Sequence, residues 1–227
     1  MTKYKPPNFK TINKEIYDAL SVLRRHGFNV NLSEELKNRF DNVILFDGDD
    51  SLFKDLIKNI DIYFEYGCGK STEYMYRFTK SKIFSVDTSK EWIDKIQSIT
   101  DDKIDDRLNL KWIDVGEIEN WGQPKSFKMR KNFTIYADWL WKQNKEPGLV
   151  LIDGRFRILC FLTTLRYSPI GTKIIFDDYK ERQLYHIVEE FSPVIDRCGR
   201  QALFESNIKA KDMITDEVLL SFQNIII

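Results

Sequence analysis

Short apolar segments alternate with helical patterns over most of the chain, and this alternation constrains the fold more than any other feature of the sequence. Strands that alternate with helices along a chain pair in parallel and are joined by right-handed crossovers. We therefore predict an α/β fold of the Rossmann-like kind, with a mostly parallel sheet flanked by helices. The expected strands are 62–66, 83–86, 108–115, 149–152 and 174–176, with an edge strand at 202–205, and the expected helices cover 71–78, 91–99, 159–165 and 185–191.

The first 59 residues follow a helical pattern without intervening strands. Ile12, Ile16, Leu20 and Leu23 recur at helical spacing, and Gly27 is a typical helix stop. We predict a helical segment over 1–59 that packs on the core, and a single domain over 60–227 that contains the sheet. The tail 213–227 fits either a helix or a strand.

Composition excludes several classes of function. Lysine plus arginine and aspartate plus glutamate each number 35, so the formal net charge is zero, which argues against a nucleic-acid partner held by a broad basic field. No stretch approaches the roughly 20 apolar residues of a membrane span, and the polar start lacks a signal-peptide core. Three cysteines without CxxC spacing are typical of reduced thiols. We expect a cytoplasmic globular protein without a membrane or nucleic-acid partner.

The glycine-rich turn after the first strand admits three ligands. A phosphate-binding P-loop requires glycine where Phe64 stands, and a dinucleotide fingerprint requires a third glycine where Thr72 stands. Glu65 places a carboxylate directly before the glycines, which disfavours a pyrophosphate and suits a cationic ligand. Gly67 and Gly69 also fit a plain tight turn, and Asp87 fits a simple helix cap.

The segment Glu65-Tyr66-Gly67-Cys68-Gly69 resembles motif I, [DE]xGxG, of the class I S-adenosylmethionine-dependent methyltransferases. The resemblance extends from about residue 62 to 205, and Ser71 stands where the family often has a third glycine. It implies a Rossmann-like fold and an enzyme that binds S-adenosylmethionine (SAM). It also implies that Asp87 holds the ribose hydroxyls and that Asp114 borders the adenine. The implied cofactor-binding residues are Glu65, Gly67, Gly69, Ser71, Asp87 and Asp114.

Three carboxylates follow the fourth and fifth strands. Asp153 ends the fourth strand, and Asp177 and Asp178 end the fifth, so the three would repel one another unless a cation lay between them. Catechol-type O-methyltransferases carry a similar set that binds magnesium, with asparagine in place of one aspartate, and this resemblance implies a Mg²⁺ site. The alternative is neutralisation by neighbouring basic residues, namely Arg155, Arg157, Lys180 or Arg182.

The same strand ends supply candidates for the reaction itself. Arg155 and Arg157 are either a clamp for an anionic substrate or members of surface ion pairs. Tyr179, Tyr185 and His186 are candidate substrate contacts or a general base, and the candidate catalytic residues are Asp153, Asp178 and His186. The irregular stretch 116–131 is a candidate lid.

These observations predict a SAM-dependent methyltransferase that methylates an oxygen of a small anionic or sugar-related metabolite. The runs 149–157, 176–179 and 197–200 are similar to those of bacterial methyltransferases of surface-polysaccharide or small-metabolite biosynthesis. Two alternatives remain open, an NAD-dependent nucleotide-sugar oxidoreductase and a non-catalytic SAM-binding protein. The sequence indicates no oligomeric state.

Overall fold

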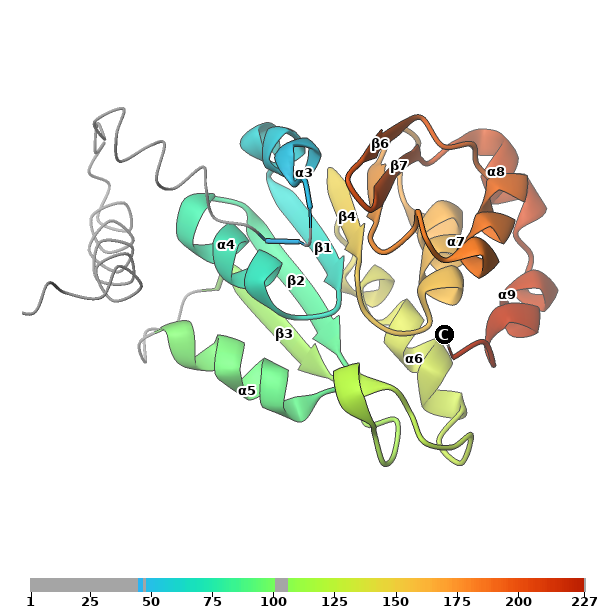
Figure 1. Cartoon of the computed structure of the whole chain (residues 1–227), viewed down its shortest axis with the longest axis horizontal. Coiled ribbons are helices and arrows are strands. Elements are labelled where there is room, and N and C mark those ends of the chain that lie inside the picture. The colour runs from blue at the N-terminus through green and yellow to red at the C-terminus, as the bar shows by residue number, and fades with distance from the viewer. Residues whose placement is uncertain (1–44, 47, 101–105, 227) are drawn as a thin grey trace, which may run out of the picture. The chain divides into compact units, whose positions relative to one another are not determined.

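A seven-stranded sheet forms the centre of the described part of the chain (Figure 1). The computed structural model describes residues 45–46, 48–100 and 106–226. The strand order is β3-β2-β1-β4-β5-β7-β6, in which β1 to β5 are parallel, β7 is antiparallel to β5, and β6 is antiparallel to β7. The strands are β1 (Ile62–Tyr66), β2 (Lys82–Asp87), β3 (Leu108–Trp112), β4 (Leu149–Ile152), β5 (Lys173–Phe176), β6 (Asp196–Cys198) and β7 (Gln201–Glu205). The predicted Rossmann-like α/β fold is confirmed.

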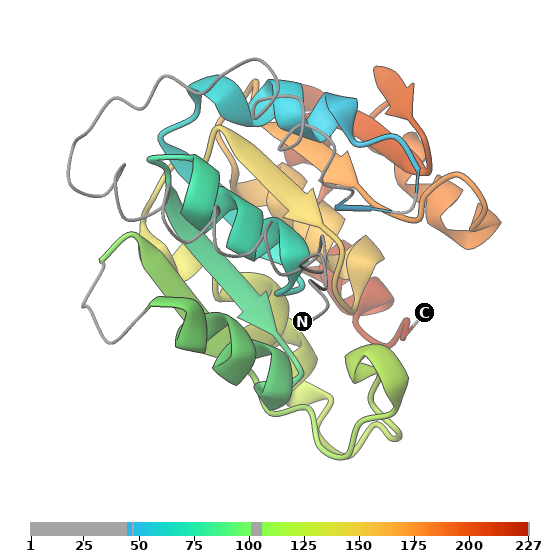
Figure 2. The same cartoon turned by 60° about the vertical axis from the view of Figure 1, so that its left-hand side comes forward.

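Helices cover both faces of this sheet. Figures 1 and 2 show α4 and α5 on one face and α6 and α7 on the other. The α-helices are α3 (Ser51–Leu56), α4 (Lys70–Phe78), α5 (Lys90–Gln97), α6 (Lys131–Asp138), α7 (Arg157–Tyr167), α8 (Ile208–Met213) and α9 (Asp216–Phe222). Short 3-10 helices are η1 (Ile57–Asn59), η2 (Ser98–Thr100), η3 (Asn120–Gly122), η4 (Trp141–Gln143) and η5 (Gln183–Glu190).

Several predicted elements differ in extent or type. The helix expected over 185–191 is the 3-10 helix η5, and the ambiguous tail 213–227 contains the helix α9, which follows α8. The third strand ends at Trp112 rather than at 115, although Ile113 and Val115 remain buried beyond its end. The helices α6 and α8 and the short strand β6 were not predicted from the sequence.

The central strands carry the core. Every side chain of β4 is fully buried, and so are Tyr63, Phe64 and Tyr66 of β1, which is typical of parallel strands covered on both faces. On the face of the sheet covered by α6 and α7, the Phe133 ring of α6 stacks on Phe156 at a centroid distance of 4.3 Å. In the described part of the chain, no helix has the length and apolar character needed to span a bilayer. All three cysteines are free thiols.

The predicted N-terminal segment lies mostly outside the described residues. Its last helix, α3, belongs to the same compact unit as the sheet, because the Phe53 ring lies edge-on to Tyr63 of β1 at 6.0 Å. The expected helices between residues 12 and 44 are not among the described residues.

The strand order fixes where a ligand binds. From β1 the chain moves outward to β2 and β3, and it then returns to β4 on the other side of β1. Open α/β sheets bind ligands beyond the carboxyl ends of the strands at such a reversal. The turns after β1, β2, β4 and β5 therefore share one edge.

Candidate active site at the carboxyl edge of the sheet

A cavity of about 1010 Å³ opens at this edge. Its walls come from the turns after β1, β2, β4 and β5, from the segment around η3, and from Arg200 of the β6–β7 turn. Leu45 and Phe46 close one side. A cavity of this size can hold a nucleoside-sized ligand together with a second small molecule.

Gly67 and Gly154 bring two of these walls into direct backbone contact. Gly67 has φ +99°, and a Cβ built on it would lie 2.7 Å from the Gly154 nitrogen. A Cβ on Gly154 would in turn lie 2.8 Å from the Gly67 nitrogen and would overlap the Tyr136 hydroxyl. Side chains at either position would force the β1 and β4 turns apart.

Gly69 has a different role. Its backbone is extended, with φ −175°, and a Cβ there would meet nothing within 4 Å. Gly69 and the two residues that follow it, Lys70 and Ser71, all line the cavity at the start of α4. Packing therefore explains the glycine at 67, whereas at 69 the missing side chain leaves room inside the cavity.

Glu65 lies beneath the glycine turn and not on the cavity wall. Its carboxylate accepts hydrogen bonds from the hydroxyls of Tyr63 at 3.0 Å and Ser85 at 2.9 Å, and from those of Ser71 and Thr72. Thr72 Oγ1 also accepts the Gly69 N–H at 2.9 Å. The predicted direct contact between Glu65 and the cofactor is therefore not what the structure shows, because four hydroxyls surround the carboxylate and hold it inside the core.

Burial raises the pKa of the Glu65 carboxyl to about 7, although its hydroxyl partners act in the opposite direction. An unfolded chain would release this proton near the ordinary value of 4.5. The stability that Glu65 contributes is therefore complete below pH 4.5 and is lost as the pH rises through 7, by roughly 3 kcal/mol. Glu65→Gln should flatten this decline, which urea unfolding of both proteins between pH 5 and 8 would measure. Parallel pH profiles would contradict the prediction.

Asp87 faces the cavity at the end of β2. Its carboxylate accepts the backbone N–H of Cys68 at 2.7 Å and that of Ser89 at 2.6 Å. Burial raises the pKa of Asp87, and these N–H donors partly offset the rise. The N-cap of α5 is Ser89, whose hydroxyl accepts from Trp92, so a capping role does not account for Asp87. Its carboxylate joins the glycine turn to the start of α5 and keeps acceptor capacity on the cavity side.

Asp114 is exposed and does not line the cavity. Its Oδ1 accepts the Gly116 N–H at 2.9 Å, because β3 ends early and the chain turns away from the sheet. The structure therefore does not place Asp114 where the predicted adenine contact requires it.

The segment around η3 occupies this side of the cavity instead. Asn120, Trp121 and Gln123 line the wall, and the Thr88 hydroxyl donates to the Gly122 carbonyl at 2.8 Å. These three residues fall inside the irregular stretch 116–131, and that irregularity was their only signal in the sequence. The structure places the stretch on the cavity, and its proposed action as a lid stays a prediction.

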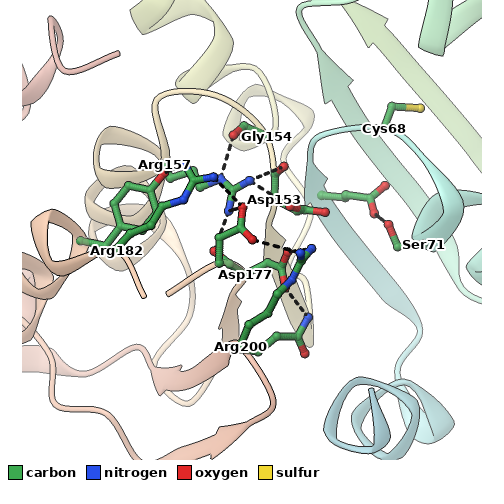
Figure 3. Close-up of polar contacts among 12 residues, drawn as sticks. Cys68, Ser71, Asp153, Gly154, Arg157, Asp177, Arg182 and Arg200 are labelled. Carbon is green, nitrogen blue, oxygen red and sulfur yellow. Dashed lines mark hydrogen bonds and ion pairs between the residues drawn. The ribbon is translucent and has the colours of Figure 1, made fainter. Parts of the chain in front are cut away.

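Asp153, Asp177 and Asp178 do come together, with carboxylate oxygens within 4.8 Å of one another. Figure 3 shows arginine side chains among them. The Arg157 guanidinium lies 3.0 Å from Asp153 and 3.1 Å from Asp178. It also donates to the backbone carbonyls of Gly154 and Asp177 at 2.9 and 2.6 Å.

Arg200 and Arg182 complete this network. Arg200 contacts both oxygens of the fully buried Asp177, at 3.1 and 2.5 Å, and lies 3.1 Å from Asp178. Arg182 lies 3.1 Å from the other oxygen of Asp178. Three carboxylates thus face three guanidiniums, which fits the predicted alternative of neutralisation by basic residues. These residues do not fit a magnesium site, because the guanidinium groups already bind the carboxylate oxygens that a magnesium ion would need as ligands.

Arg200 reaches the network through a tight turn far along the chain. Cys198 pairs with Gln201, so Gly199 and Arg200 form a two-residue hairpin loop with glycine first. Sequence reasoning missed Arg200, whose only signal was the Arg-Cys-Gly-Arg run at 197–200.

Arg155 and Arg157, which were predicted to act together as a clamp, have different surroundings. Arg157 is 3% exposed and committed to the network above, whereas the Arg155 side chain lines the cavity. Within the described parts of the chain, the Arg155 guanidinium makes no hydrogen bond or ion pair, and its Nε is buried without a partner. Of the two arginines, only Arg155 has a guanidinium that is not already engaged by the described residues and can meet an anionic ligand.

Tyr179 and His186 do not line the cavity. Tyr179 is fully buried against Phe176 and Phe204, and its hydroxyl donates to Glu189 at 2.7 Å. His186 stacks on the Tyr179 ring at 4.8 Å. The substrate role predicted for Tyr179 and the catalytic role predicted for His186 therefore lack support in the structure. Tyr185 lines the cavity instead.

No protein-family model matches the chain, and no similar sequence is found among curated proteins. Solved structures do match. A methyltransferase-like protein from Silicibacter pomeroyi is 27% identical, with a TM-score of 0.64 over 69% of this chain and 84% of that one. A methyltransferase from Geobacter sulfurreducens is 13% identical, with a TM-score of 0.46 over 89% of this chain and 100% of that one. An O-methyltransferase from Bacillus cereus, solved with S-adenosylhomocysteine (SAH), is also 13% identical, with a TM-score of 0.48 over 84% of this chain and 100% of that one.

The Silicibacter pomeroyi protein shares the fold of this chain over most of its own length. The predictions of a Rossmann-like methyltransferase fold and of an enzyme are confirmed: the chain is an enzyme with a Rossmann-like methyltransferase fold.

Proposed function

We propose that the protein transfers a methyl group from SAM to an oxygen of a small anionic or sugar-related acceptor. The observation that carries this proposal is the shared cavity. The glycine turn and Asp87, on the cofactor side, open into the same space as Asp153 and Arg155. The acceptor side of the cavity contains both an acidic group and a free cation, which suits a hydroxyl compound that also bears a negative charge.

The residues on the cofactor side fit SAM. Asp87 offers a carboxylate to the ribose hydroxyls, and Gly69 leaves the wall open where the cofactor approaches. The start of α4 presents backbone N–H groups, and Lys70 is the first residue of this helix, so the N–H groups and the Lys70 ammonium can both receive the carboxylate of the methionine part. SAM supplies an electrophilic methyl group on a positively charged sulfur.

The chain's own residues must then align the acceptor and take its proton. Asp153 is suited to the second task, because burial raises its pKa well above the ordinary value while Arg157 acts against the rise. Asp177 and Asp178 raise it further. A carboxylate with a raised pKa is a stronger base, and Asp153 reaches the cavity.

The cofactor assignment is tested by Asp87→Asn, which keeps the shape of the side chain but removes its charge. We expect calorimetry to show that wild-type protein binds SAH and neither NAD nor ATP. The variant should lose about 1.5–3 kcal/mol of binding free energy for each charge-assisted hydrogen bond to the ribose. Tighter binding of NAD than of SAH by the wild-type protein would overturn the proposed function.

The arginine network predicts that turnover does not require a divalent metal. Because guanidiniums already neutralise the three carboxylates, EDTA should leave the rate within about twofold of its starting value, and added Mg²⁺ should not raise it. The measurement is the rate of SAH formation with the acceptor at saturation. Loss of activity in EDTA with recovery in Mg²⁺ would restore the magnesium hypothesis.

A further inference from the structure

One guanidinium in the cavity, that of Arg155, forms no ion pair with a carboxylate of the residues that the structure describes. The three other arginines on the wall, Arg157, Arg182 and Arg200, each contact an aspartate at 3.1 Å or less. Arg155 is 9% exposed, and its Nε is buried without a hydrogen-bond partner. A buried charge without a partner costs free energy, so its presence on a cavity wall indicates a ligand of opposite charge.

Arg155 lies between the two sides of the cavity. Its charge lowers the pKa of Asp87 on the cofactor side, and the charges of Arg157 and Arg182 on the acceptor side act on Arg155 in turn. Asp87 forms no ion pair with it, because the Asp87 oxygens are directed to the N–H groups of Cys68 and Ser89. Arg155 is therefore close to the place where cofactor and acceptor meet.

We propose that Arg155 binds an oxyanion of the acceptor, a carboxylate or a phosphate, and thereby couples acceptor binding to the charged form of the cofactor. This inference rests on the proposed function. Before transfer, the sulfonium of SAM and the guanidinium of Arg155 are two positive charges in one cavity, and they repel each other through a medium of low polarity. An oxyanion on Arg155 cancels this repulsion, so acceptor and SAM bind cooperatively.

The reaction removes the reason for the cooperativity. The bond between carbon and sulfur breaks with both electrons staying on sulfur, and a lone pair of the acceptor oxygen forms the new bond. The proton of that oxygen passes to Asp153. SAH carries no charge on sulfur, so the oxyanion on Arg155 no longer stabilises the cofactor. The same residue thus favours assembly of the reactive complex and release of the products.

Calorimetry on the full chain tests this coupling with inorganic phosphate and acetate as separate probes. The affinities for SAM and for SAH are measured with and without each anion, in wild-type protein, in Arg155→Met and in Arg166→Met. Arg166 pairs with the exposed Asp216 and does not line the cavity, so its variant controls for the loss of one positive charge. Thermal unfolding of all three proteins confirms that the variants are folded.

In wild-type protein and in Arg166→Met, we expect one or both anions to tighten SAM about tenfold and SAH less than twofold. Arg155→Met should lose this difference and should bind SAM without anion at least as tightly as wild type. A response to phosphate alone identifies a phosphorylated acceptor, and a response to acetate alone identifies a carboxylate.

Two results would overturn the inference while leaving the proposed function intact. In one, neither anion affects SAM or SAH, and Arg155→Met weakens both equally, so that Arg155 holds the cofactor's own carboxylate. In the other, Arg155→Met keeps the full response of wild type. Failure of wild-type protein to bind SAM or SAH at all would instead overturn the proposed function.

Discussion

Replacing Gly67 with alanine should destabilise the protein by about 3 kcal/mol or more and abolish cofactor binding. The added Cβ would lie 2.7–2.8 Å from backbone atoms of Asp153 and Gly154, which belong to a strand end that cannot move independently of β4. The positive φ of 99° adds strain for any residue with a side chain. For a chain of this size the loss corresponds to a fall in Tm of roughly 6–12 °C, measurable by calorimetric unfolding.

Gly69→Ala is the matched control in the same turn. Because its Cβ would meet nothing within 4 Å and its backbone is extended, the Tm should stay within about 2 °C of wild type. The added methyl group projects into the cavity, so SAH binding should weaken even though the fold is intact. Equal losses of Tm in the two variants would mean that any side chain in this turn destabilises the protein. The close approach of Gly67 to Gly154 would then not be the cause.

The parts of the fold that the sequence predicted are those governed by local patterns. The bounds of β1 and β4 were predicted to the residue, because strands buried on both faces are continuous apolar runs with sharp ends. The end of β3 was misplaced for the same reason. Ile113 and Val115 are apolar and buried, but they lie in the segment that follows the strand.

The site residues that could be predicted from the sequence are those that directly follow a strand. Asp87 and the three aspartates after β4 and β5 were found because parallel strands bring their carboxyl ends to one edge. Tyr179 follows the same strand as Asp178, yet the left-handed backbone of Asp178, with φ +57°, turns the chain and sends Tyr179 into the core. Arg200 enters from a hairpin more than twenty residues later, and no local pattern could place it beside Asp177.

The largest effect on stability should come from Arg157→Ala. Arg157 is 3% exposed and holds Asp153 and Asp178 together while donating to the carbonyls of Gly154 and Asp177. Removal of one partner from a buried ionic network typically costs about 3–5 kcal/mol, since the remaining charges lose their compensation. Arg157→Lys should recover only part of this, because an ammonium cannot reproduce a planar fork that reaches several acceptors at once.

The pH dependence of Arg157→Ala distinguishes the loss of charge compensation from a simple packing defect. Arg157 lowers the pKa of Asp153, so its removal should raise that pKa further. Protonation of Asp153 relieves the repulsion among the carboxylates, and the stability difference between variant and wild type should therefore shrink as the pH falls. Urea unfolding of Arg157→Ala, Arg155→Met and wild type at pH 8, 6.5 and 5 measures this difference. Arg155→Met should remain close to wild type at each pH, since the Arg155 guanidinium forms no ion pair with any carboxylate in the described ranges. A difference between Arg157→Ala and wild type that does not change with pH would show that the lost hydrogen bonds to backbone carbonyls, and not the bare carboxylates, account for the destabilisation.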